Sequence, residues 1–244
     1  MIPKHVIQIW LQGKYELPPK EEGFTRQNEV LCNAYGYSYT FYDDSMIRTE
    51  LPTQLLEKYD DTEVFAQKSD IARYYLLYKY GGIYIDADAF MIKPFDSEVL
   101  SNDFVICGHP YIPWKVNNGI LACCKQSKIM KLILDHVLAA DNKCKRNDFY
   151  CVQNSTGPWS VGKIFFENRD TENSKLLPYE YWEPCVGGRC KISPNTQVVH
   201  IHSQTWIKHT WLKYAGVLVA LILLSIIYRR NRSKFHLKTK SVQR

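Results

Sequence analysis

The chain lacks several features that would assign it to common protein classes. None of its eight cysteines forms a C-x-x-C pair, which disfavours a structural zinc site. It has no internal repeat and no low-complexity tract, which argues against a repeat architecture and a disordered scaffold. Met1-Ile2-Pro3 leads directly into the first expected strand, so we expect no secretory signal peptide. The composition, 45% hydrophobic and 23% charged over 244 residues, suffices for one sizeable core in one or two domains.

Basic residues are distributed unevenly along the chain. The formal net charge is +6, yet seven Lys and Arg lie within residues 229–244. The rest of the chain is therefore close to neutral. We expect no nucleic-acid partner.

A charge-free stretch, Tyr214 to Tyr228, precedes this basic tail. It is slightly shorter than the roughly 20 residues that span a bilayer, and Trp211 and other aromatic residues lie at its ends. We expect a single transmembrane helix as a membrane anchor over residues 206–228, followed by a basic tail over 229–244. A buried core helix is the alternative.

The sequence features that bear on cellular location disagree with one another. The basic tail favours a cytosolic C-terminus and places the preceding domain in the lumen of the Golgi or ER. Two close cysteine pairs, Cys144/Cys151 and Cys185/Cys190, also fit an oxidising lumen, although buried free thiols are the alternative. The missing signal peptide opposes this orientation.

The segment from Ser69 to Asp88 carries the strongest functional signal. Apolar residues at helical spacing run up to Gly81-Gly82, where an αL cap is expected to end the helix. An apolar strand, Ile83 to Ile85, follows and leads into Asp86 and Asp88. In extended backbone, this spacing points both carboxylates to one side, where they repel unless a cation lies between them. Oxygen ligands suit Mg²⁺ or Mn²⁺, which predicts metal-assisted chemistry on a phosphate-bearing substrate.

Other interpretations of these residues are open. Asp70 and Arg73 lie three residues apart and could form only a surface ion pair. The two aspartates could merely cap a turn. Against this, Asp is depleted in strands, and ligands of α/β proteins bind at the carboxyl ends of strands.

These residues resemble a known family. Ser69 to Tyr74 (SDIARY), Tyr80 to Tyr84 (YGGIY) and Asp86 to Asp88 (DAD) are similar to the sugar-binding region, with its Asp-x-Asp motif, of family 32 glycosyltransferases. This family includes fungal outer-chain mannosyltransferases, inositol-phosphoceramide mannosyltransferases and capsule-synthesis enzymes.

The resemblance extends over about the first two hundred residues. Ile2 to Trp10 resembles the family's first strand, with Ile7 in place of a histidine. Thr156-Gly157-Pro158 resembles its Thr-Gly-Pro turn. His200 and Thr205-Trp206 resemble its closing His-x-x-x-x-Ser-Trp motif.

The resemblance implies roles for individual residues. Asp88 is expected to bind the metal, and Asp86 to bind the metal, the ribose or the sugar. Asp70 and Arg73 are expected to hold the donor sugar and its phosphates. These four residues are the candidate catalytic set.

Further donor and metal contacts are implied outside the motif. Trp10 could stack on the nucleotide base and Gln8 could reach the same base, whereas core packing is the alternative for Trp10. Asn118 lies where the family has a polar residue near the sugar. His200 is the expected third metal ligand, and His202 is the alternative histidine.

The resemblance implies an α/β fold with a GT-A type nucleotide-sugar-binding sheet flanked by helices over residues 1–205. It also implies a retaining, Mn²⁺- or Mg²⁺-dependent transfer of a hexose, with mannose favoured, to a glycan or glycolipid acceptor. GDP-mannose is the favoured donor, and a UDP-sugar is possible.

Two other functions are considered. A non-catalytic nucleotide-sugar-binding membrane protein would keep the fold without turnover, but the full set of charged residues argues against decay. A metal-dependent phosphatase of the haloacid-dehalogenase type also places Asp-x-Asp after an apolar strand. In that class Thr or Val normally stands where this chain has Phe90, and the motif follows the first strand.

Strands are expected to alternate with helices, as in an α/β sheet with an inserted or antiparallel edge. The expected strands are 6–10, 37–42, 83–85, 90–93, 104–107, 119–124 and 198–201, and the expected helices are 21–34, short segments within 45–59, 69–80, 129–139 and 159–168.

Overall fold

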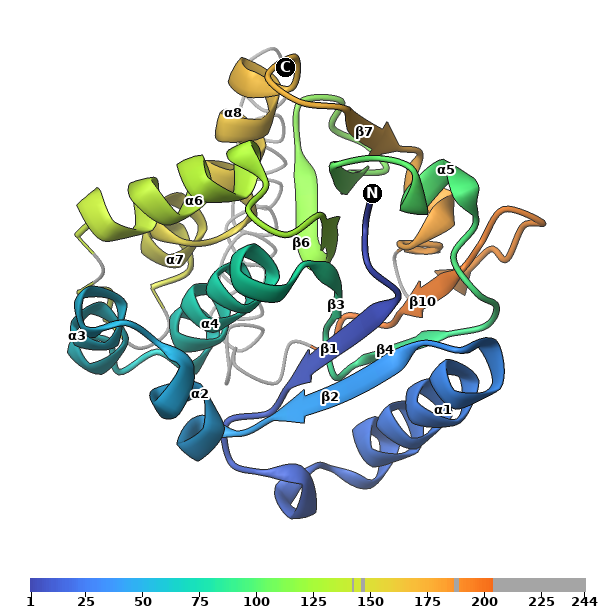
Figure 1. The fold of residues 1–244 in the computed structure, drawn as a ribbon, viewed down its shortest axis with the longest axis horizontal. Helices are drawn as coiled ribbons and strands as arrows, with labels where there is room; N and C mark the ends of the chain where they lie inside the picture. Colours follow the sequence, from blue (N-terminus) through green and yellow to red (C-terminus); the bar gives the residue numbers. More distant parts are fainter. Residues whose placement is uncertain (142, 146–147, 187–188, 204–244) are drawn as a thin grey trace, which may run out of the picture. The chain divides into compact units, whose positions relative to one another are not determined.

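A six-stranded mixed sheet, in the order β2-β1-β3-β6-β5-β7, lies at the centre of the fold (Figure 1). Strand β6 is antiparallel to both of its neighbours, whereas the other adjacent strands of this sheet are parallel. The strands are β1 (His5–Ile9), β2 (Ser38–Tyr42), β3 (Gly82–Ile85), β5 (Phe104–Gly108), β6 (Val116–Cys123) and β7 (Ser174–Leu177). The predicted α/β class is confirmed. Strand β3 is buried throughout, as predicted, although only one of its two neighbours is parallel.

This computed structural model describes residues 1–141, 143–145, 148–186 and 189–203. Met1–Ser203 forms one unit of the chain, and a second unit begins at Gln204. The predicted membrane anchor, the basic tail and Thr205-Trp206 all lie outside the described residues. Within the described ranges, no helix combines the length and the apolar character needed to cross a bilayer.

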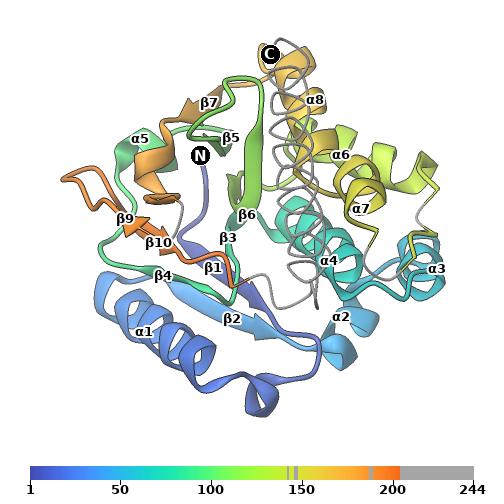
Figure 2. The same cartoon turned by 180° about the vertical axis from the view of Figure 1, so that it is seen from behind.

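Alternate residues of the strands face two separate cores. Tyr84 and Leu121 pack on one face with helices α4 (Phe65–Tyr80), α6 (Lys128–Ala139) and α8 (Pro158–Asn168). Their neighbours in sequence, Ile83 and Ala122, pack on the other face with helix α1 (Pro19–Tyr35), as Figure 2 shows from behind. This alternation is the period-two pattern of a strand. It buries apolar residues on both faces of the sheet.

The remaining helices and 3-10 turns are short. They are α2 (Asp44–Glu50), α3 (Thr53–Asp61), α5 (Ser97–Leu100), α7 (Phe149–Ser155) and the 3-10 turns η1 (Lys14–Glu16) and η2 (Tyr179–Tyr181). Each expected helix and strand is present within a few residues of its predicted bounds. The edge strand β7 and helix α7 were not expected, because neither has a strong hydrophobic period.

A two-stranded antiparallel ribbon brings the C-terminal part of the unit to the motif. Strand β4 (Ala89–Met91) pairs with β10 (Val198–His200), and His200 lies opposite Ala89. His200 is therefore fixed beside the turn that contains the two aspartates.

Both close cysteine pairs are joined as disulfides. Cys144 is bonded to Cys151, and Cys185 is bonded to Cys190 across the hairpin of β8 (Cys185–Val186) and β9 (Arg189–Cys190). The other four cysteines are free thiols. Of the two alternatives left by the sequence, the disulfide applies to both pairs.

The Gly81-Gly82 pair differs from the αL cap that the sequence predicts. Gly81 has φ 68° and ψ −177°, and its N–H donates to Leu77 O. Gly82 has φ +114°, and a Cβ there would lie 2.3 Å from His5 O. Strand β3 enters the sheet beside β1 at this point. Two glycines are needed because the backbone must turn sharply and pass directly against the first strand.

Replacing Gly82 by alanine should destabilise the fold. We expect Gly82→Ala to lower the free energy of unfolding by at least about 2 kcal/mol, from left-handed backbone strain and backbone overlap together. The matched control is Gly23→Ala, because Gly23 is an exposed residue inside α1 with no heavy atom within 4 Å of an added Cβ. This control should stabilise by about 0.5–1 kcal/mol. Urea unfolding measures both, and equal midpoints would contradict the role of Gly82.

Candidate active site

The two aspartates lie in a tight turn between β3 and β4. Asp86 directly follows β3, and the Ala89 N–H donates to Asp86 O at 3.0 Å. The expectation that extended backbone aligns the two side chains is therefore wrong, because the strand ends at Ile85. The carboxylates still converge, since one ligand atom each of Asp86, Asp88 and His200 lie within 4.8 Å of one another.

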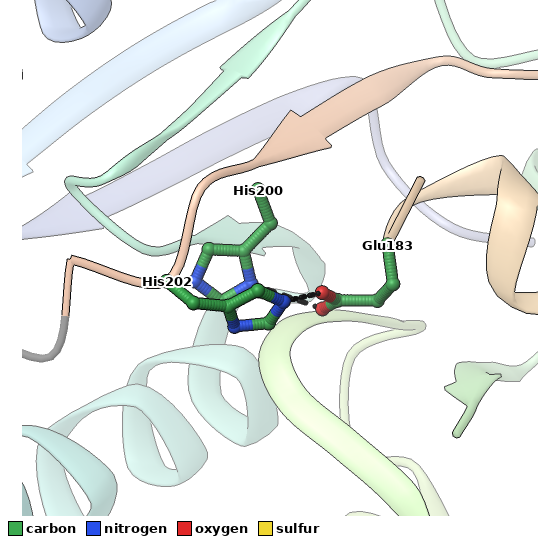
Figure 3. A group of neighbouring side chains, drawn as sticks. All are labelled: Glu183, His200 and His202. Carbon is green, nitrogen blue, oxygen red and sulfur yellow. Dashed lines mark hydrogen bonds and ion pairs between the residues drawn. The ribbon is translucent and has the colours of Figure 1, made fainter. Parts of the chain in front are cut away.

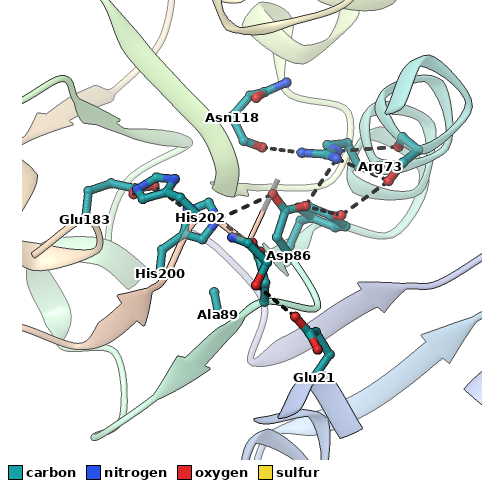
Figure 4. A network of polar contacts seen from close by, with 12 residues as sticks. Glu21, Arg73, Asp86, Ala89, Asn118, Glu183, His200 and His202 are labelled. Atoms are coloured by element: carbon teal, nitrogen blue, oxygen red, sulfur yellow. Dashed lines mark hydrogen bonds and ion pairs between the residues drawn. The ribbon is translucent and has the colours of Figure 1, made fainter. Parts of the chain in front are cut away.

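His200 provides the point on which the two carboxylates converge (Figure 4). Its Nε2 atom lies 3.0 Å from Asp88 Oδ1 and 3.9 Å from Asp86 Oδ2. The β4–β10 pairing fixes this position through the backbone. Of the two candidate histidines in the sequence, His200 is thus the one that meets both aspartates.

Gly119 on β6 makes room for this meeting. A Cβ at Gly119 would lie 2.6 Å from both Asp86 Oδ2 and His200 Cε1. The Asp86 N–H also donates to Gly119 O at 2.8 Å. A side chain at this position would fill the space in which the carboxylate and the imidazole approach each other.

Arg73 and Tyr84 hold the other oxygen of Asp86. The Tyr84 hydroxyl donates to Asp86 Oδ1 at 2.6 Å, and Arg73 Nη2 lies 3.2 Å from the same oxygen. The guanidinium also stacks over the Tyr84 ring, 4.4 Å from its centroid. Asp86 Oδ1 is therefore bound by the protein, while Oδ2 is directed to His200.

Asp70 joins three segments beneath the site. Its Oδ2 accepts from Thr156 Oγ1 at 2.8 Å, and its Oδ1 accepts from Asn118 Nδ2 at 2.9 Å. Asn118 O in turn accepts from Arg73 Nη1 at 2.7 Å. Asp70 and Arg73 are both almost fully buried, so they form an internal network and not a surface ion pair. Their contact with a donor stays a prediction.

The pKa shifts reflect this buried charge. Burial raises the pKa of Asp70 to about 7 although Arg73 opposes the rise, and burial also raises the pKa of Asp86. Burial acts to raise the pKa of Asp88 too, but the hydrogen bond and charge of His200 outweigh it and lower that pKa to about 2. The pKa of His200 lies well above its ordinary value, because Glu183 and Asp88 outweigh its own burial. The cluster therefore favours a positive charge at its centre.

Gln8 lies near the end of β1 and contacts the turn, and Trp10 directly follows the strand. The fully buried Gln8 donates from Nε2 to Asp86 O at 3.1 Å and accepts at Oε1 from Tyr39. It thus fixes the turn's backbone. The indole Nε1 of Trp10 is buried without a hydrogen-bond partner among the described residues. The predicted base contacts of both residues stay predictions.

Three polar residues near the site were not predicted from the sequence. The Ser203 N–H donates to Asp88 Oδ2 at 2.6 Å, and the Ser203 hydroxyl donates to the buried Glu21 at 2.8 Å. Glu183 lies behind His200 and also contacts His202 (Figure 3). The sequence carries no signal that separates Glu183 from Glu180, because both carboxylates stand among the aromatic residues of the same short segment.

The donor set is chemically suited to a divalent cation. Two carboxylate oxygens and one imidazole nitrogen lie close enough to share one ion, and Gly119 keeps the space between them free of side-chain atoms. Asp86, Asp88 and His200 are thus the residues that would hold such an ion.

Sequence comparisons identify related proteins. The model of the family "Glycosyltransferase sugar-binding region containing DXD motif" matches residues 24–105. The uncharacterized glycosyltransferase L373 of Acanthamoeba polyphaga mimivirus is 30% identical over 227 residues, which cover 86% of this chain and 85% of that protein. Inositol phosphoceramide mannosyltransferases 3 and 2 of Schizosaccharomyces pombe are 34% and 26% identical, over 36% and 68% of this chain. The chain spans only 24% and 46% of the lengths of those two enzymes.

The solved structures that align with the chain do so with TM-scores below 0.5. The PaToxG glycosyltransferase has a TM-score of 0.49 at 18% identity, over 68% of this chain and 70% of its own. Mouse xyloside xylosyltransferase 1 has a TM-score of 0.47 at 10% identity, over 82% of this chain and 98% of its own. The viral relative aligns along most of the sequence, and Asp86-Ala87-Asp88 falls inside the matched region. The chain therefore belongs to the glycosyltransferases whose sugar-binding region contains the DXD motif.

Proposed function

We propose that this glycosyltransferase is a metal-dependent, retaining enzyme of the GT-A type that transfers a hexose from a nucleotide sugar to a glycan or glycolipid. The observation that carries the proposal is the convergence of Asp86, Asp88 and His200 on one small space. Oxygen and imidazole ligands in this arrangement are typical of a divalent cation site. The DXD motif of the family falls on the first two of these residues.

The balance of charge supports a bound cation. Three carboxylates, those of Asp86, Asp88 and Glu183, surround the imidazole of His200, and Glu183 also contacts His202. Arg73 is already paired with Asp86 and lies 3.5 Å from Asp70. Burying this many acidic groups is costly unless positive charge compensates them. A divalent ion would supply that compensation.

The imidazole ligand favours Mn²⁺ over Mg²⁺, which prefers an all-oxygen set. When bound, the dication would offset the negative charge that develops on the departing diphosphate. Arg73 and Tyr84 keep Asp86 Oδ1 occupied, so that Oδ2 faces the metal position. Gln8 holds the backbone of the same turn. These residues orient the ligands before the donor arrives.

The fission yeast relatives support mannose as the sugar and a glycolipid as the acceptor, because they are named inositol phosphoceramide mannosyltransferases. GDP-mannose is therefore the favoured donor, with a UDP-sugar as the alternative. The fold alone does not distinguish a guanine donor from a uracil donor.

We also propose that the enzyme is anchored in a Golgi or ER membrane with its catalytic unit in the lumen. The charge-free stretch at residues 214–228, outside the described residues, supports the anchor. The two disulfides support an oxidising compartment.

Removing one ligand should abolish transfer. We expect Asp88→Asn to lower kcat by at least about 100-fold, because the amide cannot replace the charge that the metal requires. The matched control is Asp170→Asn, which removes an exposed carboxylate in the loop after α8 and should leave turnover unchanged. Release of nucleoside diphosphate from the donor measures both variants. Near-normal turnover of Asp88→Asn would contradict the assignment.

Removing the metal should have the same effect in the wild-type protein. EDTA should stop diphosphate release, and added Mn²⁺ should restore it more fully than Mg²⁺. The assay is run with GDP-mannose, UDP-glucose and UDP-galactose in parallel, and proton NMR of the product reports the anomeric configuration. Full turnover in EDTA would rule out metal dependence, and an inverted product would rule out retention.

A further inference from the structure

Glu183 is a buried carboxylate behind the proposed metal site (Figure 3). Only 1% of the residue is exposed, and each of its oxygens faces an imidazole. Oε1 lies 3.0 Å from His200 Nδ1, and Oε2 lies 2.8 Å from His202 Nε2. A carboxylate this deeply buried needs such partners, because burial without them is strongly unfavourable.

The contact with His200 selects one nitrogen of the ring. A neutral imidazole carries one N–H group and one lone pair. Without an ion, each ring nitrogen of His200 lies 3.0 Å from a carboxylate oxygen, an arrangement that suits a ring with a hydrogen on both nitrogens. A bound metal would displace the hydrogen on Nε2, so that Nδ1 still donates to Glu183 and the Nε2 lone pair is left for the ion. Nε2 is the atom that lies 3.0 Å from Asp88 Oδ1 and 3.9 Å from Asp86 Oδ2. We propose that Glu183 is a positioning residue that holds the His200 ring with Nε2 directed at the metal. This inference rests on the metal site proposed above.

His202 strengthens the hold on the carboxylate. Its φ of +52° is uncommon for a residue other than glycine, and this backbone turn brings the ring back against His200. The two ring centroids are 4.0 Å apart with an interplanar angle of 33°. Glu183 Oε2 lies within ion-pair distance of His202 Nε2, although this contact lacks hydrogen-bond geometry, and rotation of the carboxylate away from His200 would lose both contacts.

The backbone that carries Glu183 is itself well anchored. The Glu183 N–H donates to Tyr179 O at 2.7 Å, and the fully buried Trp182 donates from its indole to Gln197 Oε1 at 3.1 Å. Gln197 immediately precedes β10, which carries His200. The carboxylate and the histidine are therefore tied to the same small framework. Because both residues are held in this way, the His200 ring can keep one orientation relative to the metal position.

A direct Mn²⁺ titration tests this role. Free Mn²⁺ is followed by EPR as the ion is added to the full-length chain in detergent. We expect Glu183→Gln to raise the Mn²⁺ Kd by about 10- to 100-fold, as is usual when the partner of a metal-binding histidine is lost. The matched control is Glu180→Gln, which removes a carboxylate three residues earlier and should leave the Kd unchanged. In a His200→Ala background, Glu183→Gln should cause no additional loss.

The other possible outcomes of the Mn²⁺ titration lead to different conclusions. An unchanged Kd in Glu183→Gln, or an equal loss in the His200→Ala background, would overturn the positioning role while leaving the metal site intact. A second equivalent of Mn²⁺ that disappears in Glu183→Gln would make Glu183 a ligand, together with the two histidines, and would also overturn it. If the wild type binds no Mn²⁺, the proposed metal dependence fails first, and the inference fails with it.

A measurement on the wild type keeps the inference testable should Glu183→Gln not fold. The nitrogen-15 shifts of the histidine rings are recorded with one equivalent of Zn²⁺ as a diamagnetic probe, and the His200 signals are assigned by their absence in His200→Ala. We expect a protonated Nδ1 and a metal-bound Nε2 on His200. The reversed pattern would overturn the proposal.

Discussion

The burial of negative charge at the end of β3 is the constraint that governs this structure. Asp86 and Asp88 are drawn into a region where a carboxylate without a partner is strongly disfavoured. The surrounding residues provide separate partners for the individual carboxylate oxygens. Arg73 and Tyr84 bind one oxygen of Asp86, His200 faces both aspartates, and the Ser203 N–H binds Asp88.

The central sheet makes these contacts possible. Its single antiparallel strand among the described ones, β6, carries Asn118 and Gly119 to the end of β3. Asn118 links Asp70 to Arg73, and Gly119 leaves room for Asp86 and His200. Scaffold and site thus share the same few residues. A substitution in this region would affect both the stability and the chemistry of the protein.

Much of this arrangement follows from local sequence patterns. The sequence predicts the helix before the Gly-Gly break and the buried strand, because helical and strand periods are local properties. It also predicts that Asp86 and Asp88 follow the end of that strand. His200 could be selected only through a family motif at the end of the domain. The pairing of β4 with β10, which brings it to the aspartates, depends on contacts far apart in sequence.

The residues that sequence reasoning missed or misjudged depend on those distant contacts. Glu183 contacts His200 only because η2 lies beside β10 in the fold. Gly119 lies next to Asp86 only because β6 pairs with β3. The amide of Gln8 holds the backbone of Asp86, a contact that follows only from the pairing of β1 with β3, and its predicted base contact stays a prediction. The extended geometry expected for the aspartates failed because a tight turn begins where β3 ends.

The ribbon of β4 and β10 also has a consequence for the order of events during synthesis. Ser203 meets Asp88 across a separation of 115 residues, so this contact cannot form until nearly all of the described unit has left the ribosome. Closing so long a loop carries an entropic penalty that shorter-range packing does not. The first strands of the sheet can therefore pair before the contact between Ser203 and Asp88 forms. A nascent or truncated chain that stops before His200 would contain the acidic turn but would lack the third residue of the proposed metal site.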